Sequence, residues 1–260
     1  MNSALFTEIA GNFDPISLSQ MDKVSFLSRK DTKYVMSAEQ LMKVLHEMMP
    51  QYHILEIDGV REFTYNSRYL DTNGFGMYMA HHNKRKNRYK CRMRVYENTG
   101  LTYWEIKHKT NRNITTKKRI KINPEGVSEE DIQAFIHHYL PYQFSTLESK
   151  LVSRFKRMTF VNNNMTERIT IDRDLSWSND KHKIHMDGLT IVEVKNDCKA
   201  TLAQLYPILR KYGIKPGSFS KYTFGCALLY SHLKHNMIKT KLSYINQFCH
   251  ASTPQHSIHA

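Results

Sequence analysis

The sequence predicts an α+β fold in which most strands carry one apolar face and one charged face. Several segments alternate apolar and charged residues with the period of a β-strand, and the segments between them show helical periodicity with capping residues. Helices in these positions would cover the apolar faces from outside and leave the charged faces directed inward. A β-barrel with a polar interior is one architecture that fits, and the ordinary alternative is an antiparallel sheet with its polar face in water.

The segment RYKCRMRVY at residues 88–96 shows this alternation most clearly. Arg88, Lys90, Arg92 and Arg94 share one face of the expected strand. Neighbouring cations on such a face repel each other by about 0.6 kcal/mol in water and by about 2.4 kcal/mol at an effective dielectric constant of about 20. The face is stable only where water, carboxylates or a bound polyanion compensates its charge. The segment therefore predicts either a solvated basic strand or an anion-binding site.

Further strands with the same arrangement are expected along the chain. Their charged faces contain mostly Lys and Arg with a few Asp and Glu, and almost no Ser, Thr or Gln. For any single strand, exposure of the polar face to water is the simpler explanation, but the shared pattern favours charged faces that look into a common interior. The expected strands span residues 29–36, 101–109, 115–122, 167–175 and 190–195.

Four helices are expected between and after these strands. Ser37 caps the first helix, with Gln40 three positions later, and Pro50 ends it. The chain shows no internal repeat and no linker rich in Gly, Pro or Ser, which favours one domain. The other helices are expected at about residues 128–140, 199–212 and 220–234.

The composition favours a polyanionic partner. The chain has 260 residues, and 38 Lys and Arg against 24 Asp and Glu give a net charge of +14. This balance suits phosphate chains, nucleotides, nucleic acid or an anionic membrane. No apolar run approaches the ~20 residues of a transmembrane helix, and the N-terminus lacks a signal-peptide pattern. The four cysteines are scattered, with no C-x-x-C pair, so we expect a cytoplasmic protein without a zinc site.

Nine short motifs, in this order, resemble the VTC domain. This is the polyphosphate polymerase domain of the CYTH-like triphosphate tunnel metalloenzyme superfamily, here in a stand-alone form. The resemblance implies an antiparallel closed β-barrel of about eight strands with flanking helices, which forms a tunnel lined by cations. The motifs are RKDTKY (29–34), SRYLDT (67–72), YKCRMRVY (89–96), WEIKHK (104–109), KKRI (117–120), RFKRMTF (154–160), RITIDRDL (168–175), VEVK (192–195) and SFSKYTFG (218–225).

The resemblance also implies metal-dependent phosphoryl transfer that makes polyphosphate from a nucleoside triphosphate. Mn²⁺ or Mg²⁺ would be held by Glu193, with Asp172 or Asp31 as further candidate ligands. The first motif departs from the E-x-E-x-K of tunnel triphosphatases, because only one carboxylate precedes its lysine. Catalytic roles are implied for Lys33, Arg92, Arg94, Lys107, Arg157, Arg168 and Glu193. Phosphate binding is implied for Lys33, Arg92, Arg94, Lys107, Lys117, Arg119, Arg157, Arg168, Lys195 and Lys221.

The resemblance divides the chain into an N-terminal extension (1–28) that packs on the barrel, the VTC-like tunnel domain (29–236) and a C-terminal tail (237–260). A nucleoside triphosphate and polyphosphate are the expected partners, and no nucleic acid is expected. The alternatives are a non-catalytic module that binds polyphosphate or nucleotides, and an inorganic triphosphatase. A nucleic-acid binder that stacks bases on Tyr89 and Tyr96 ranks below them. A membrane-protein partner and the oligomeric state stay open.

Overall fold

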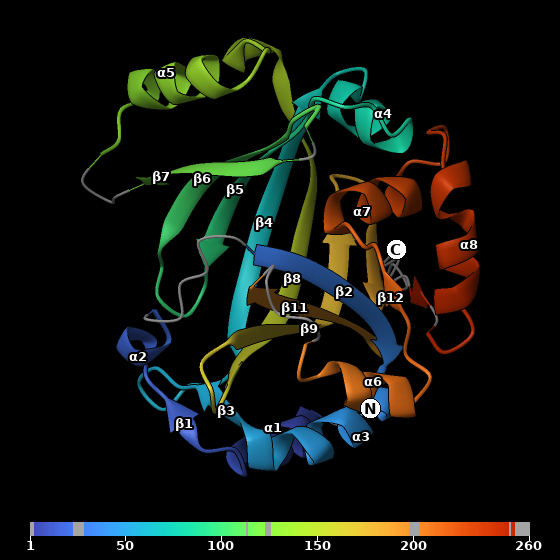
Figure 1. Cartoon of the computed structure of the whole chain (residues 1–260). Helices are drawn as coiled ribbons and strands as arrows, with labels where there is room; N and C mark the ends of the chain where they lie inside the picture. The colour runs from blue at the N-terminus through green and yellow to red at the C-terminus, as the bar shows by residue number, and fades with distance from the viewer. Residues whose placement is uncertain are drawn as a thin grey trace, which may run out of the picture.

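Strongly curved antiparallel strands form the centre of the molecule (Figure 1). The structure, a computed structural model, describes residues 3–22, 29–112, 114–122, 126–197, 203–249 and 251–252. Within them, a path of nine strands runs in the order β12-β2-β11-β9-β8-β4-β5-β6-β7. Their bounds are β2 (Arg29–Ser37), β4 (Phe63–Thr72), β5 (Arg88–Tyr96), β6 (Thr102–Lys109), β7 (Thr115–Ile122), β8 (Leu147–Asn162), β9 (Glu167–Ser178), β11 (Leu189–Asp197) and β12 (Pro216–Gly217).

The sheet is not closed, so the expected closed barrel is wrong in this respect, whereas the antiparallel α+β architecture is confirmed. Within the described residues, β7 pairs with β6 alone and β12 with β2 alone. Closure would require the outer edge of β2 to pair with β7, but β12 already pairs with that edge at Tyr34 and Lys33. It would also bring Lys33 towards Lys117 and Arg119 of β7, and like charges opposed across strands destabilise a sheet.

The cross-strand register places the charged residues of the long strands on one inner face. Arg92 lies opposite Glu105, and Glu105 lies opposite Arg119. At the other end of the sheet, Glu193 lies opposite Lys33. Directly opposed residues of antiparallel strands project to the same side, so the period-two alternation seen in the sequence is carried from strand to strand. The sequence expectation of a shared charged face is confirmed.

Helices cover the outer face of the sheet at two places. Helix α3 (Ala38–Met48) begins with a capping box formed by Ser37 and Gln40, as expected. Its buried Leu41 and Val44 pack with Ile169 of β9 and with other apolar residues of β2 and β11. Helix α1 (Ser3–Gly11) joins the same core through Phe6 and Ile9.

Helix α5 (Glu129–Tyr139) covers the other half of the sheet and confirms the second expected helix. Ser128 and Asp131 form its capping box. Ile136 packs with Trp104 and Ile106, which occupy the apolar face of β6. The charged residues of β6 are therefore left to the inner side.

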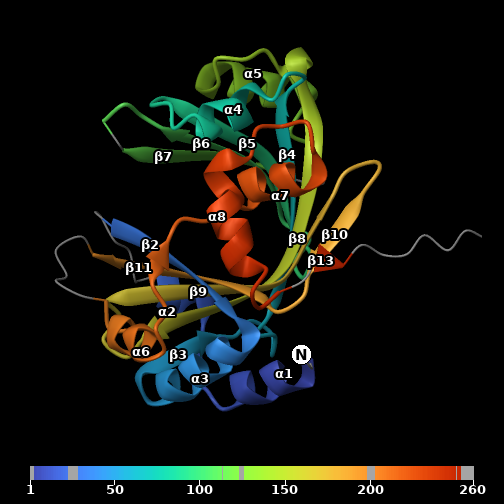
Figure 2. The same ribbon diagram turned by 90° about the vertical axis from the view of Figure 1, so that its right-hand side faces the viewer.

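Helices α7 (Lys221–Leu229) and α8 (Asn236–Ile245) flank the space in front of the inner face, beside α4 (Gly76–His82) (Figure 2). The helix expected at 220–234 thus ends at Leu229, and a separate helix follows. Of the helix expected at 199–212, the described part is α6 (Tyr206–Lys211), and residues 198–202 lie outside the described chain. Among the described helices, each is too short or too polar to cross a membrane.

Shorter elements complete the fold. Strand β3 pairs with β8 and, in parallel, with β1, while β10 pairs with β9 and β13. The bounds of these elements are β1 (Pro15–Ile16), α2 (Leu18–Asp22), β3 (Tyr52–Leu55), β10 (Lys183–Met186), β13 (Ala251–Ser252) and the 3₁₀ turns Met49–Gln51 and Phe144–Thr146.

Candidate functional site

Three carboxylates on the inner face each hold several cations. Glu105 of β6 has a fully buried side chain, and the Arg92 guanidinium binds it at 2.7 Å from Nε to Oε2. Lys117 of β7 contacts its other oxygen, and Arg94 lies 3.9 Å away. Burial opposes ionisation of Glu105, but Arg92, Arg94 and Lys117 outweigh it and hold its pKa well below the usual value. The carboxylate thus compensates the repulsion among these cations.

Asp172 of β9 is the centre of the second cluster. Arg157 of β8 donates two hydrogen bonds to it, from Nε to Oδ1 at 2.5 Å and from Nη2 to Oδ2 at 2.8 Å. Lys221 contacts the same carboxylate from the first turn of α7. Burial again opposes ionisation, and Arg157 and Lys221 overcome it, so the pKa of Asp172 is lowered.

Glu193 of β11 is the centre of the third cluster. Lys33 of β2 lies 2.5 Å and Lys195 lies 3.2 Å from its oxygens. Although burial disfavours its charged form, Lys195 and Lys33 keep the pKa of Glu193 far below the usual value. The side chain of Glu193 is 16% exposed, against 4% for Asp172 and none for Glu105. Glu193 is therefore the most accessible of the three.

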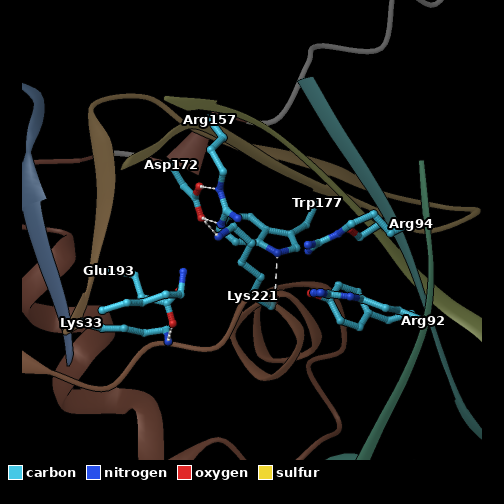
Figure 3. Close-up of polar contacts among 11 residues, drawn as sticks. Lys33, Arg92, Arg94, Arg157, Asp172, Trp177, Glu193 and Lys221 are labelled. Carbon is cyan, nitrogen blue, oxygen red and sulfur yellow. Dashed lines mark hydrogen bonds and ion pairs between the residues drawn. The ribbon is translucent and has the colours of Figure 1, made fainter. Parts of the chain in front are cut away.

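The clusters surround a common interior (Figure 3). Glu193 and Lys33 reach in from one wall, Arg92 and Arg94 from the opposite wall, and Lys221 lies between them. Strands that are distant in the sheet order therefore direct cations into one space. This arrangement suits a ligand with several negative charges.

A cavity of about 660 Å³ opens beside these clusters. Lys33 and Glu193 line it from one side of the sheet, and Lys90 and Lys107 from the other. Of the residues expected to act in catalysis or phosphate binding, Lys33, Lys107 and Glu193 belong to this lining, as does Asp31, a further candidate metal ligand. The remaining ones lie elsewhere on the inner face or at its helix, and they are Arg92, Arg94, Lys117, Arg119, Arg157, Arg168, Lys195 and Lys221.

The VTC domain family model matches residues 28–230, most of the chain. The chain belongs to the VTC domain family. This confirms the resemblance found in the motifs. No curated protein sequence matches the chain.

Solved structures with a similar fold are distant from this VTC domain in sequence. A Hippeastrum protein described as having a dominant triphosphatase activity is 11% identical, with a TM-score of 0.49, 79% of this chain and 99% of that chain covered. A candidate adenylate cyclase from Bacillus halodurans is 10% identical, with a TM-score of 0.49 and coverage of 75% and 96%. A second candidate adenylate cyclase, from Vibrio parahaemolyticus, is 11% identical, with a TM-score of 0.44 and the same coverage.

Two lysines that line the cavity of this VTC domain have pKa values well below that of an ordinary lysine. Burial and repulsion from Lys33 and Arg92 lower the pKa of Lys90 to about 7. Desolvation by the surrounding protein and repulsion from Arg92 also lower the pKa of Lys107 to about 7, although its side chain is exposed to the open cavity. Lys33, which lines the same cavity from the other wall, contributes to the repulsion on both lysines. Lys90 Nζ also donates a hydrogen bond to Ser220 Oγ at 2.9 Å.

The carboxylates fit a hard divalent cation only in part. Within the described residues, no three Asp, Glu, His or Cys side chains converge as a metal cage. Asp172 is committed to Arg157 and Lys221, whereas Glu193 and Asp31 both line the cavity. Mg²⁺ is commonly held by one or two carboxylates together with water and substrate phosphates. The donor set therefore fits an ion that arrives with a phosphate ligand.

The other expected residues lie on the inner face with different surroundings. Arg119 is exposed on β7 and stacks over the ring of Tyr103 at 4.8 Å. Arg168 lies opposite Lys195 in the register of β9 and β11. These positions agree with the shared inner face but lie outside the cavity lining.

The residues that fix α7 beside the site were missed by sequence reasoning. Trp177 donates through Nε1 to the backbone oxygen of Lys221 at 2.9 Å, and Gly225 packs directly against the Trp177 indole. Buried Asp71 accepts a hydrogen bond from Tyr222 and from the backbone of α4. The motifs SRYLDT and SFSKYTFG contained Asp71, Tyr222 and Gly225, but the contact between Asp71 and Tyr222 joins segments 151 residues apart.

Proposed function

We propose that this VTC domain transfers the terminal phosphoryl group of a nucleoside triphosphate to a polyphosphate chain. The observation that supports it most is the cavity in which Lys33 and Glu193 face Lys90 and Lys107. Lysines brought together in this way, with depressed pKa values and few carboxylates, favour a polyanionic ligand. Membership of the VTC domain family supports the same ligand class.

Phosphoryl transfer requires positioning and charge neutralisation more than covalent help from the protein. A terminal oxygen of the acceptor chain would attack the γ-phosphorus, and the bond to the β–γ bridging oxygen would break with its electron pair leaving on the nucleoside diphosphate. Arg157 keeps Nη1 free of Asp172, since that carboxylate takes only Nε and Nη2. Such a guanidinium can bind a phosphate oxygen while its ion pair fixes its orientation.

The lysines of the cavity would hold the non-bridging oxygens as point charges. Lys33, Lys90 and Lys107 approach from opposite walls, so they can neutralise neighbouring phosphates at the same time. Mn²⁺ or Mg²⁺, held by Glu193 together with Asp31, would supply further neutralisation of the phosphate oxygens. Lys33 and Lys195 would keep Glu193 ionised for that purpose.

A non-catalytic module that binds polyphosphate is the second candidate. It is favoured by the pairing of the carboxylates with cations, because Glu105 and Asp172 are committed to their ion pairs and Glu193 would have to share its oxygens between Lys33, Lys195 and a metal. An inorganic triphosphatase would use water as the acceptor in the same site.

Incubation of the purified protein with ATP and Mn²⁺, followed by separation of products by chain length, tests the proposal. Polyphosphate is the expected product. Release of inorganic phosphate alone would identify a triphosphatase, and tight binding of tripolyphosphate with no product would identify a binding module. Failure to bind tripolyphosphate would contradict every phosphate-based function.

The variant Glu193→Gln separates binding from turnover. We expect it to bind tripolyphosphate at least as well as the wild type, because a negative charge beside the ligand is removed, and to lose turnover. Glu97→Gln is the matched control, since Glu97 pairs with Arg154 at 2.9 Å and does not line the cavity. Full activity of Glu193→Gln would remove Glu193 from the mechanism.

A further inference from the structure

The cations that line the cavity are of two kinds. Lys33 is paired with Glu193 at 2.5 Å. Six others have no ion pair with a carboxylate anywhere in the described part of the chain: Lys84, Arg88, Lys90, Lys107, Lys109 and Lys241. The cations that pair with Glu105, Asp172 and Glu193, Lys33 included, are thus compensated by the protein, whereas these six are not. Their charges are therefore stabilised by water or are available to an anion from solution.

Four of these cations gather at the end of the cavity formed by α4 and α8. Lys84 follows α4, Arg88 begins β5, Lys109 ends β6 and Lys241 belongs to α8. Arg88 and Lys109 are directly opposed in the strand register. Lys84 and Lys241 line the same cavity, and burial together with repulsion from Lys84 lowers the pKa of Lys241. We call these four residues the outer cluster.

Arg88 has an unused donor within this cluster. Its Nε is buried and has no hydrogen-bond partner among the described residues, while Nη1 donates to the backbone oxygen of Arg85 at 2.8 Å. Buried donors are nearly always satisfied in folded proteins. Since Arg88 lines the cavity while its Nε is buried, an anion there would approach the terminal nitrogens of its guanidinium.

The chemistry of this end of the cavity favours phosphate over a nucleobase. The aromatic residues Phe219 and Phe224 line it but are only 8% and 1% exposed, so they offer little surface for stacking. Ser218, Ser220 and Thr223 add polar groups beside the cations. Charge and hydrogen-bond donors suit non-bridging phosphate oxygens.

We propose that the outer cluster is an additional subsite for the distal phosphates of a chain longer than triphosphate. The subsite makes the domain prefer long polyphosphate to tripolyphosphate, and this inference rests on the proposed phosphate-binding function of the central site. Lys241 lies beyond residues 28–230, the region matched by the VTC family model. Helix α8 thus adds a ligand-binding element that the family motifs do not contain.

The test compares binding of inorganic tripolyphosphate and of long-chain inorganic polyphosphate, by calorimetry at constant ionic strength. The variant is Lys84→Ala/Lys241→Ala in the full chain. The control is Lys86→Ala/Lys239→Ala, which removes the same charge from the same two regions at exposed positions outside the cavity lining. We expect the first pair to weaken long-chain binding about tenfold, with little change for tripolyphosphate, and the control pair to leave both unchanged.

Several results would overturn the inference. Wild-type affinity of Lys84→Ala/Lys241→Ala for the long chain would show that the outer cluster does not bind it. Equal weakening for both ligands, or equal weakening by the control pair, would show a general electrostatic effect and no subsite. Wild-type protein that binds neither ligand would refute the proposed function as well. Binding with the expected length dependence but without turnover would leave the subsite intact and refute catalysis alone.

Discussion

Arg157 and Asp172 lie directly opposite each other on β8 and β9 and form a two-point ion pair at 2.5 and 2.8 Å. Lys221 of α7 contacts the same carboxylate, so the cluster joins two strands of the sheet to a helix. The Asp172 side chain is only 4% exposed. Removing one member of such a buried group leaves the charge of the others uncompensated, which is more destabilising than removing a surface ion pair.

Asp172→Asn is expected to lower the free energy of unfolding by about 3 kcal/mol at neutral pH, because Arg157 and Lys221 then repel each other. Tripolyphosphate should restore a larger share of stability to this variant than to the wild type, since its phosphates replace the lost carboxylate. Chemical denaturation with and without ligand measures both effects. Asp174→Asn is the control, because Asp174 is 36% exposed and does not line the cavity. Equal stabilisation of all three proteins by the ligand would contradict the expectation.

Arg92 combines a structural and a ligand-binding role, which a double variant separates. Arg92→Ala is expected to weaken tripolyphosphate binding about tenfold and to destabilise the fold by about 2 kcal/mol, because Glu105 is fully buried and loses its closest arginine. In the double variant Arg92→Ala/Glu105→Gln, much of the lost stability should return. The affinity for tripolyphosphate should stay low, because no arginine is present at position 92. Denaturation and calorimetry on the four proteins of this cycle provide the check. Recovery of affinity together with stability would show that Arg92 acts only on the fold.

Binding of tripolyphosphate is expected to take up protons at about pH 8. Lys90 and Lys107 have pKa values of about 7 and are mostly neutral there, and bound phosphates raise these pKa values. Affinity should therefore fall as the pH rises from about 7 to about 9. Calorimetry in buffers of different ionisation enthalpy measures the uptake. The variant Lys90→Arg/Lys107→Arg should abolish the proton uptake. The control Lys118→Arg, on the other face of β7, should leave it unchanged. Proton uptake that persists in the first variant would exclude Lys90 and Lys107 as its source.

The inner face was predictable from sequence because it depends on a local property. Alternation fixes the side of a strand to which Arg92 and Lys107 project, and antiparallel pairing preserves that side from strand to strand. The capping boxes at Ser37 and Ser128 are local as well. The motifs then identified the family from residues within these strands.

Features that depend on distant segments were not predictable. The pairing of Lys33 with Glu193 spans 160 residues, and that of Lys221 with Asp172 spans 49. The outer edge of β2 is paired with Pro216 and Gly217, two residues without any strand pattern of their own. The position of α8 over the cavity likewise follows from tertiary packing.

The contact between α7 and β9 gives the last prediction. A Cβ atom added to Gly225 would lie 2.8 Å from Trp177 Nε1 and even closer to the ring carbon beside it, so an alanine cannot be accommodated without a shift of α7. Trp177 also holds the backbone oxygen of Lys221, at 2.9 Å. Gly225→Ala should therefore lower the free energy of unfolding by about 1–3 kcal/mol and weaken tripolyphosphate binding, because Lys221 moves away from the inner face. Gly11→Ala, where a Cβ meets no atom within 4 Å, is the control for denaturation and calorimetry. Loss of stability with unchanged affinity would show that the position of α7 does not matter for the ligand.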